Sequence, residues 1–394
     1  MKFSVLLPTR NRLDLLSRAI ETVRRQDYDD WEIIVSDNYS EENIADYILS
    51  LGDERIKYFR TDSFIPVTDN WNNAIEKSDG DYVIMLGDDD GLMTGYFSTL
   101  IGLIEKFNSP DFIYTNAFLY AYPGVLPGVP EGFLRTYSRR EIFQSTHDPF
   151  WLDKNKAIKF VQSSLDFRVT FDYNMQFSLV SRKIIEEMKQ YGSFYQSPYP
   201  DYYASNAIMF KAERILVVPI PLVIIGISPK SFGYYYFNDA ESDGNAFLKN
   251  IPDQALVSRL QNVILPGTDM NTSWLISMET LAEKFRLNVQ YSRYRYIQAC
   301  VVYAGVTLRK DKAKQVYLQL KKKLTVGERV RYTILFSLLS KVVFGSYRSA
   351  LSQYILSSAG SHPACYMPNL KGKFNTILEV FERVNPNKYE ELEP

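Results

Sequence analysis

The chain has 394 residues, of which 46% are hydrophobic and 23% are charged, so it can bury the core of two domains or of one large domain with an appendage. Its two cysteines exclude a disulfide framework and a thiolate metal cluster, and they fit a reduced protein. The first residues lack the apolar run of a signal peptide, and no apolar stretch reaches the roughly 18 residues of a membrane-spanning helix. We therefore expect a cytoplasmic protein, located at most at the inner face of a membrane.

The formal net charge of −1 hides an asymmetry along the chain. Residues 284–348 contain 15 lysines and arginines against two acids, whereas residues 1–283 contain 26 basic and 39 acidic side chains. An acidic front part does not suit nucleic-acid binding. The basic rear part suits contact with anionic lipid or with an acceptor that carries phosphate.

Strand-like and helix-like segments alternate over the first 120 residues. Short apolar runs predict strands at residues 3–8, 31–37, 55–60, 82–86 and 111–120. Apolar residues at helical spacing predict helices at residues 12–26, 41–52, 68–78 and 94–107. This alternation predicts an α/β fold with a Rossmann-like, mainly parallel sheet and helices on both faces. Ligands bind such sheets at the carboxyl ends of the strands.

The later part of the chain changes from mixed α/β patterns to helical ones. Residues 153–226 stay mixed and include a helix that starts near Asp201, and helical patterns dominate after residue 250. The polar segment at 226–233 is either a closing loop or an ordinary connection. We expect a catalytic domain at residues 1–245 and a mainly α-helical C-terminal domain at residues 246–394, which serves acceptor, oligomer or membrane-surface contacts.

Three consecutive carboxylates, Asp88, Asp89 and Asp90, follow the predicted strand at residues 82–86. Side chains alternate along an extended chain, which would place Asp88 and Asp90 on one side. Two carboxylates in a crevice need a cation, and ligands that offer only oxygen suit Mg²⁺ or Mn²⁺. The alternative is an acidic turn, since Asp is common where a strand leads into a helix.

Polar residues also follow the other predicted strands. The segment "PTRNR" at residues 8–12 ends the first strand, and Asp37 ends the second. Asn70 and Asn73 lie three residues apart, on one face of the third predicted helix. Each feature alone fits ordinary turn or cap chemistry. Together, at successive strand ends, they indicate one ligand-binding crevice.

The sequence resembles the inverting family-2 nucleotide-sugar glycosyltransferases of the GT-A fold. The resemblance covers roughly residues 1–230 and rests on "SVLLPTRNR", "WEIIVSDNYS", "DNWNNAIEKSDGDYVIMLGDDD", "SPYPDYYASNAI" and "VPIPLVIIGISP". It implies a GT-A fold, a nucleotide-diphosphate sugar as donor, a hydroxyl acceptor and Mn²⁺ or Mg²⁺ as cofactor. UDP is the nucleotide that the resemblance favours, with GDP and dTDP as alternatives.

The resemblance also implies roles for individual residues. Asp201 matches the position of the catalytic base, which takes the proton of the acceptor. Gly87 stands where the family usually has its first acid, so either Asp90 with Asp88, or Asp89 in place of one of them, would hold the metal. The residues implied to bind the nucleotide are Pro8, Thr9, Asn11, Arg12, Asp37, Asn70, Asn73, Asp88 and Asp89.

The Gln-x-x-Arg-Trp motif of processive polysaccharide synthases is absent from the sequence, which indicates the addition of one sugar. The resemblance implies a carbohydrate or lipid-linked acceptor in the assembly of bacterial-type surface glycans. Two other readings remain: a sugar nucleotidyltransferase, and a non-catalytic interaction protein that retains the fold. No glycine-rich basic loop follows the first strand, which counts against the first of these.

Residues 328–356 read as an amphipathic helix, with an interruption expected at Gly345. Packing within a helical domain or a homodimer interface is the interpretation we favour. The alternative is that the basic region 284–356 lies on an anionic membrane surface. Neither histidine, His147 or His362, is expected to act as a base or a metal ligand.

Overall fold

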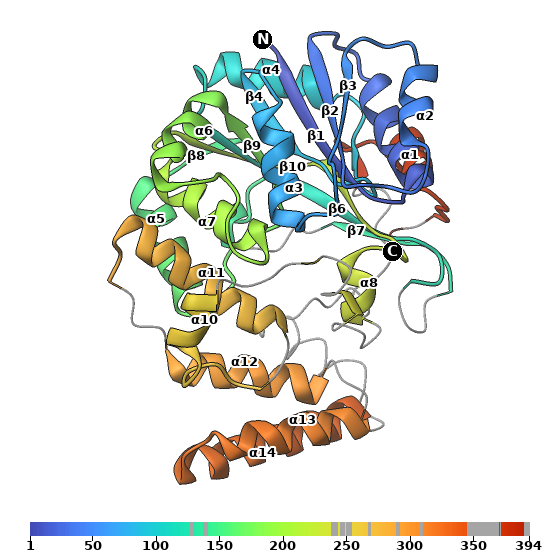
Figure 1. The fold of residues 1–394 in the computed structure, drawn as a ribbon. Coiled ribbons are helices and arrows are strands. Elements are labelled where there is room, and N and C mark those ends of the chain that lie inside the picture. The colour runs from blue at the N-terminus through green and yellow to red at the C-terminus, as the bar shows by residue number, and fades with distance from the viewer. Residues whose placement is uncertain are drawn as a thin grey trace.

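The computed structural model describes residues 1–125, 130–136, 141–237, 243–244, 249, 254–266, 269–288, 292–306, 310–344, 370 and 372–389. Within these ranges a ten-stranded sheet carries helices on both faces, and a group of further helices follows at one end of the molecule (Figure 1). The predicted fold class, an α/β sheet with an added helical C-terminal region, is confirmed.

The strands are β1 (Phe3–Thr9), β2 (Trp31–Asp37), β3 (Ile56–Arg60), β4 (Tyr82–Met85), β5 (Gly91–Leu92), β6 (Phe112–Ala121), β7 (Phe133–Thr136), β8 (Phe150–Leu152), β9 (Ser178–Ser181) and β10 (Ile215–Ile227). The helices of the sheet region are α1 (Leu13–Arg24), α2 (Ile44–Ser50), α3 (Val67–Glu76), α4 (Tyr96–Lys106), α5 (Lys154–Leu165), α6 (Arg182–Met188), α7 (Pro200–Lys211) and α8 (Phe232–Phe237). The later helices are α10 (Gln254–Leu260), α11 (Asp269–Phe285), α12 (Arg293–Val306), α13 (Lys310–Lys322), α14 (Val326–Phe344) and α16 (Ile377–Arg383). Three short 3₁₀ helices complete the set, namely η1 (Glu141–Phe143), η2 (Met175–Phe177) and η3 (Lys189–Tyr191).

The first four strands form the parallel half of the sheet in the order β3-β2-β1-β4. Every residue of β2 and β4 is buried, because helices cover this part of the sheet on both faces. In the register of β1 and β2, Thr9 lies opposite Asp37. The carboxyl ends of these strands therefore meet, as the sequence predicts.

The second half of the sheet is mixed. The antiparallel strand β9 lies between β4 and β6, so the predicted fifth strand does not pair directly with the fourth. Beyond β6, strand β10 runs parallel to β6 and antiparallel to the two-residue strand β5. Because β5 directly follows Asp90, this pairing brings the end of β10 to the acidic run.

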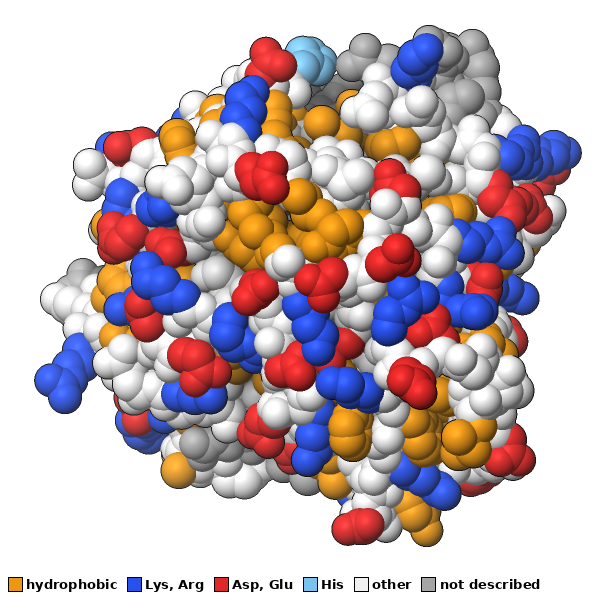
Figure 2. All heavy atoms as spheres, turned by 90° about the horizontal axis from the view of Figure 1, so that it is seen from above, with side chains coloured by type: hydrophobic (Ala, Val, Ile, Leu, Met, Phe, Trp, Pro, Cys, Tyr) orange, Lys and Arg blue, Asp and Glu red, His pale blue; other side chains and the backbone are white. Residues whose placement is uncertain are grey.

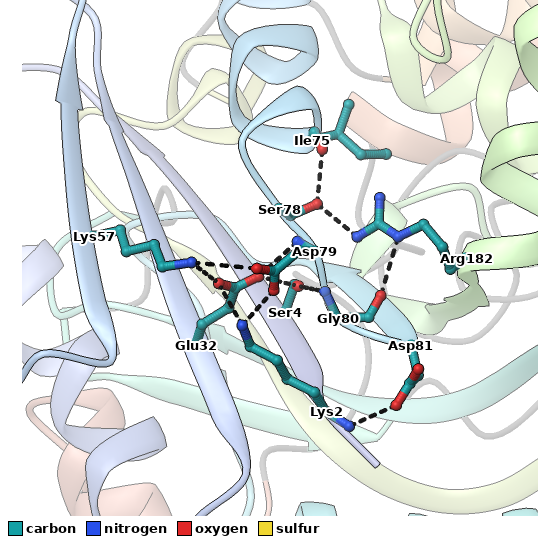
Figure 3. A network of polar contacts seen from close by, with 10 residues as sticks. All are labelled: Lys2, Ser4, Glu32, Lys57, Ile75, Ser78, Asp79, Gly80, Asp81 and Arg182. Carbon is teal, nitrogen blue, oxygen red and sulfur yellow. Dashed lines mark hydrogen bonds and ion pairs between the residues drawn. The ribbon is translucent and has the colours of Figure 1, made fainter.

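An ion-pair network centred on the buried Glu32 joins the amino-terminal ends of the parallel strands (Figure 3). The carboxylate of Glu32, on β2, accepts hydrogen bonds from the Ser4 hydroxyl at 2.6 Å, the Lys57 ammonium at 2.6 Å and the Asp79 backbone N–H at 2.8 Å. Lys2 forms an ion pair with the same carboxylate. These bonds connect β1, β2, β3 and the start of β4 at the edge opposite the polar strand ends.

The face of the molecule at this edge is seen from above in Figure 2. Basic and acidic side chains are interspersed across it, around a limited area of hydrophobic side chains. Mixed signs of this kind are typical of a solvated surface.

The C-terminal helices have a core of their own and also contact the sheet region. Buried side chains of α10, α11, α12, α13 and α14 form a second hydrophobic cluster. Trp274, on α11, donates a hydrogen bond to the Ser164 carbonyl at 2.9 Å and packs against Tyr202 of α7. Helix α16 returns to the sheet region, where Ile377 and Val380 join the first core. The predicted domain boundary near residue 245 lies outside the described residues, and the two-domain division stays a prediction.

Candidate active site

The carboxylate of Asp88 binds directly to the end of β1. The Thr9 hydroxyl donates to Asp88 Oδ2 at 2.8 Å, and Arg12 Nη1 donates to Asp88 Oδ1 at 2.9 Å. Arg12 immediately precedes α1, and its guanidinium also donates to the carbonyl of Lys230. Two predicted site segments that are more than 70 residues apart in sequence are thus in contact.

The carboxylate of Asp90 turns inward. Its Oδ1 accepts the Gly226 backbone N–H at 2.7 Å, and its Oδ2 accepts Gln176 Nε2 at 2.6 Å and the Gly87 backbone N–H at 2.9 Å. A Cβ at position 87 would lie 2.6 Å from Asp90 Oδ2. The glycine that departs from the family pattern therefore gives room to the Asp90 side chain in this turn.

Asp89 binds to the segment that follows β10. The Ser228 hydroxyl donates to Asp89 Oδ2 at 2.7 Å. The backbones approach so closely here that a Cβ at Gly226 would lie 1.9 Å from the Asp89 carbonyl oxygen. All three carboxylates of the run are buried.

Burial of these acids shifts their protonation. It raises the pKa of Asp89, with the charge of Asp88 acting in the same direction and that of Arg12 acting against it. Burial and the neighbouring charge of Asp89 raise the pKa of Asp90 well above the usual carboxylate range. The cluster is therefore short of positive charge, even though Arg12 stands beside it.

The carboxylate of Asp37, at the end of β2, accepts hydrogen bonds from β3 and from the turn after β2. Tyr58 donates its hydroxyl to Asp37 Oδ2 at 2.6 Å, and the Ser40 backbone N–H donates to Oδ1 at 2.9 Å. Burial, together with this bond to a carboxylate, raises the pKa of the Tyr58 hydroxyl. Tyr58 belongs to β3, and its direction follows from the alternation along that strand.

The two asparagines predicted to line the nucleotide pocket form hydrogen bonds from α3 to β2. Asn70 accepts a hydrogen bond from the Ser36 hydroxyl at 2.8 Å and donates to the Ser36 carbonyl at 3.1 Å, and it is buried. Asn73 donates to the same hydroxyl at 2.8 Å. Both amides thus have partners within the protein, beside Asp37.

Asn11, after β1, and Lys230, after β10, contact each other beside the acidic run. Asn11 adopts a left-handed backbone conformation with φ 54°, and its side-chain oxygen accepts the Glu41 N–H at 2.6 Å. Lys230 Nζ donates to the Asn11 carbonyl at 2.6 Å. Pro8 is partly exposed on β1, next to Thr9. The loop after β10 therefore lies against the predicted nucleotide-binding residues.

Asp201 lies in the first turn of α7, directly after Pro200. It is the second residue after the N-cap, Tyr199, and its Oδ1 accepts the backbone N–H of the adjacent Tyr202 at 3.0 Å. Burial of its carboxyl raises the pKa of Asp201 to about 7. A carboxylate with this pKa is suited to accept a proton near neutral pH.

Helix α7 is linked to the acidic cluster through η2. The Ser205 hydroxyl, on α7, donates to the Tyr173 carbonyl at 2.6 Å, and η2 follows with Gln176, which donates to Asp90. Tyr199, next to Pro200, packs edge-on against Phe232 of α8. The middle of α7 is therefore connected to the acidic run through η2, and the residue before α7 contacts α8.

A cavity of about 350 Å³ lies beside the segment that leads into α7. Its wall includes Thr68 and Asp69 of α3, Ser197 of the loop before α7, and Thr280 and Lys284 of α11. Its volume lies in the roughly 300–1,000 Å³ range of small-molecule sites. Asp201 is three positions after Pro198, which lies in the cavity wall, and this limits the distance between their Cα atoms to about 11 Å.

Among the residues that the structure describes, no group of three or more His, Cys, Asp or Glu side chains is arranged to hold a metal ion. The chemistry of the donor set nevertheless fits a hard divalent cation, because Asp88 and Asp90 offer only oxygen and the cluster is short of positive charge. His362 lies outside the described residues.

Sequence reasoning missed three partners of the acidic run, namely Gln176, Gly226 and Ser228. Gly226, near the end of β10, and Ser228, just after it, belong to the segment 226–233, for which the sequence left a closing loop or a connection open. Gln176 carries no signal in the sequence, because η2 reaches Asp90 only through the insertion of β9 between β4 and β6.

Several curated proteins are similar to part of the chain, and two of them are named as glucosyltransferases. One is the GalNAc(5)-diNAcBac-PP-undecaprenol beta-1,3-glucosyltransferase of Campylobacter jejuni, 41% identical over 103 residues, which are 25% of this chain and 33% of the relative. Another is the UDP-Glc:alpha-D-GlcNAc-diphosphoundecaprenol beta-1,3-glucosyltransferase WfgD of Escherichia coli, 27% identical over 113 residues, or 29% of this chain and 44% of the relative. The chain thus spans between a third and a half of the length of these relatives.

Among solved structures, that of TarS residues 1–349 from S. aureus in complex with UDP-GlcNAc is similar at a TM-score of 0.47 and 14% identity, covering 89% of this chain and 94% of that one. The family model of glycosyl transferase family 2 matches residues 4–188, which run from β1 to the end of α6 and include the acidic run. The chain therefore carries a domain of glycosyl transferase family 2.

Proposed function

We propose that the protein transfers one sugar from a nucleotide-diphosphate sugar to a hydroxyl group of its acceptor, with inversion at the anomeric carbon. The observation that carries this proposal is the carboxylate of Asp201, which has a pKa of about 7 and stands at the start of a helix linked to the acidic cluster. In an inverting transfer a base must take the proton of the attacking hydroxyl, and this carboxylate is suited to do so.

The donor is proposed to lie at the carboxyl ends of β1, β2 and β4. Asp37 would accept hydrogen bonds from the nucleoside, and the Arg12 guanidinium beside Asp88 would face the diphosphate. The name of the E. coli relative specifies UDP-Glc, which supports UDP as the nucleotide. Pro8, Thr9 and Asn11 would form the floor of this pocket, with Asn70 and Asn73 behind it.

Metal dependence is part of the proposal. Asp88 and Asp90 would hold Mn²⁺ or Mg²⁺, with Asp89 as the alternative ligand. Such an ion neutralises the negative charge that develops on a departing nucleotide diphosphate. The raised pKa values of Asp89 and Asp90 support a cation here, because bound positive charge stabilises ionised carboxylates.

The acceptor is proposed to be a lipid-linked sugar of bacterial glycan assembly. Both relatives have names that specify undecaprenol-linked substrates. The cavity between α3, the loop before α7 and α11 would receive the acceptor sugar, because its wall includes Pro198, three positions before Asp201. A homodimer, which the sequence suggested, stays a prediction.

A thermal-shift screen tests the donor half of this proposal. The full chain is heated with UDP, GDP, dTDP and their sugars, each with and without Mn²⁺. We expect one nucleotide to raise the midpoint, and to raise it more when Mn²⁺ is present. If no nucleotide shifts the midpoint under either condition, the protein does not bind such donors and the proposal is wrong.

A further inference from the structure

Helix α14 (Val326–Phe344) exposes an apolar stripe on its outer side. The side chains of Val326, Val330, Ile334 and Leu338 are 76%, 63%, 58% and 58% exposed. Their spacing of four residues places them on one face of the helix, one turn apart. We call these four residues the α14 stripe.

The stripe is not the packing face of the helix. Tyr332 and Leu339, on the other side of α14, are buried in the second hydrophobic cluster, and Phe336 stacks on Tyr317 of α13 at 4.1 Å between ring centroids. Helix α14 is therefore held on its neighbours by one face while the α14 stripe points outward. A continuous exposed apolar surface of this kind marks an interaction site.

The two helices that carry and neighbour the α14 stripe are rich in basic side chains. On α13 and the turn after it these are Lys314, Lys321, Lys322 and Lys323, and on α14 they are Arg329 and Arg331. Among the side chains described on α13 and α14, the one acid is Glu328, which is paired with Arg293 at 3.0 Å. The pair of helices that bears the stripe is thus strongly cationic.

An aromatic side chain lies at the border of this surface. The Tyr294 ring is 42% exposed and carries the Arg331 guanidinium at 4.3 Å from its centroid. Tyrosine and arginine at the border between apolar and charged surface are typical of proteins that contact the lipid headgroup region.

We propose that the α14 stripe lies on the anionic surface of a membrane, with its aliphatic side chains in the headgroup layer and the surrounding lysines and arginines on lipid phosphates. Charge complementarity singles out anionic lipid as the occupant, since the cationic border would repel the same border on a second copy of the chain. In the part of the chain that the structure describes, every helix is too short or too polar to cross a membrane, so the contact runs along the helix.

The position of α14 suits this contact. In Figure 1, α13 and α14 lie at the end of the molecule toward which the carboxyl ends of β1 and β2 point. The face with interspersed charges in Figure 2 lies at the other end. A membrane under α14 would therefore be on the side of the proposed donor site, from which a lipid-linked acceptor would be reached.

Vesicle co-sedimentation of the full chain tests the proposal. The probes are vesicles of phosphatidylcholine with a quarter of phosphatidylglycerol, and vesicles of phosphatidylcholine alone. We expect the wild type to bind the anionic vesicles at low salt and to bind less as salt is added. The double variant I334D/L338D should bind at least about tenfold more weakly, because it places two carboxylates in the headgroup layer.

The matched control is Leu49→Asp, which makes the same kind of change at a 78% exposed leucine of α2, in the sheet region. It should bind the vesicles like the wild type. The same thermal midpoint for all three proteins shows that they are folded. A second variant, K322Q/K323Q, should lose anionic-lipid preference while keeping the α14 stripe.

Three results would overturn the proposal: no binding of the wild type to anionic vesicles at low salt, equal binding by I334D/L338D, or a concentration-dependent dimer that this variant abolishes without any change in vesicle binding. The third result would assign the α14 stripe to contact between two copies. Failure of the proposed transfer reaction would appear instead as a lack of donor binding in solution, which does not involve the α14 stripe.

Discussion

Asp201 combines two properties that normally conflict. It lies in the first turn of α7, where a negative charge is favourable, yet burial raises its pKa to about 7. A residue that only stabilised the helix would gain nothing from this shift, because the shift disfavours the ionised form. The conflict is expected where a carboxylate serves catalysis and the fold carries the cost.

Replacement of Asp201 separates these two roles. Asp201→Asn should lower kcat by about 10²- to 10⁴-fold, because the acceptor proton loses its base. The same change should raise Tm at pH 8, since it removes a carboxyl group whose ionisation the fold disfavours. Donor binding, measured by thermal shift with the nucleotide sugar, should stay near that of the wild type.

Asp62→Asn, on an exposed loop residue, is the matched control and should leave both quantities unchanged. A loss of donor binding in Asp201→Asn would place Asp201 in the donor site instead. A lower Tm at pH 8 would mean that the carboxylate stabilises α7, and the catalytic role would lose its main support.

The pH dependence of activity follows from the same pKa. Because the base acts as the carboxylate, kcat/KM for the acceptor should be low below pH 6 and rise with an inflection near pH 7. The folded pKa of Asp201 lies above its usual value of 3.8, so the fold disfavours ionisation of this carboxyl, and the free energy of unfolding should fall as the pH rises from 3.8 to about 7. A profile that is flat from pH 5 to pH 8 would contradict the assignment of Asp201.

Among the elements, strand β2 carries a charged residue in a fully buried position. Burial acts to raise the pKa of Glu32, but the hydrogen bonds from the Asp79 N–H, Lys57, Ser4 and Lys2 outweigh it and lower the pKa to about 2. Hydrogen bonds and ion pairs of the Glu32 carboxylate thus connect the amino-terminal ends of four strands. Removing one member of a buried ion pair leaves the other charge without a partner, which strongly destabilises the folded protein.

Glu32→Gln should lower the free energy of unfolding at pH 7 by on the order of 2–3 kcal/mol. Since the folded pKa is depressed, the contribution of Glu32 is present above pH 4.5 and is lost as the pH falls from there toward 2. Urea unfolding at pH 7 and at pH 3.5 should show the gap between variant and wild type narrowing at the lower pH. A gap that stays constant would show that packing, and not charge, holds this position.

Strand β10 depends on a glycine where it passes the acidic run. A Cβ at Gly226 would lie 1.9 Å from the Asp89 carbonyl oxygen. This oxygen belongs to the backbone, so it cannot move away unless the chain around Asp89 moves too. Gly226→Ala should therefore separate β10 from the acidic run, lower stability by about 1–3 kcal/mol and weaken donor binding. Thermal unfolding with and without the nucleotide sugar measures both effects.

Gly102, in α4, is the matched control for this substitution. A Cβ there would meet nothing within 4 Å, and the residue lies inside a helix. Gly102→Ala should raise stability by about 0.5–1 kcal/mol, because alanine favours the helix. Equal effects of the two substitutions would show that the close approach at Gly226 does not constrain the site.

At the scale of the whole molecule, the C-terminal helices contact α7, the helix that carries Asp201. The hydroxyls of Ser197, before α7, and Ser277, on α11, lie 2.7 Å apart, and Trp274 of α11 packs on Tyr202 of α7. The segment that carries Asp201 is therefore fixed between the sheet region and α11. This arrangement joins the proposed chemistry to the part of the chain that bears the α14 stripe.

The amino-acid sequence by itself determined the parallel half of the fold and the polar residues at its strand ends. Helical and buried-strand patterns depend only on residues close in sequence, so they can be recognised without a structure. Parallel strands bring their carboxyl ends to one edge of the sheet, so Thr9, Asp37 and Asp88 were predictable as neighbours. The motif residues around them are local as well, which is why the family resemblance could be seen without a structure.

Only the tertiary structure decided the partners of the acids and the outer face of α14. Gln176 and Gly226 reach Asp90 because β9 inserts between β4 and β6 and because β10 pairs with β5, and such long-range pairings leave no periodic trace in the sequence. The apolar residues of α14 surround much of the helix, so their pattern cannot tell which side is packed. Contact with α12 and α13 buries Leu339 and leaves Ile334 and Leu338 outside. Which face of a helix is buried depends on the elements that it packs against, and only the tertiary fold sets those contacts.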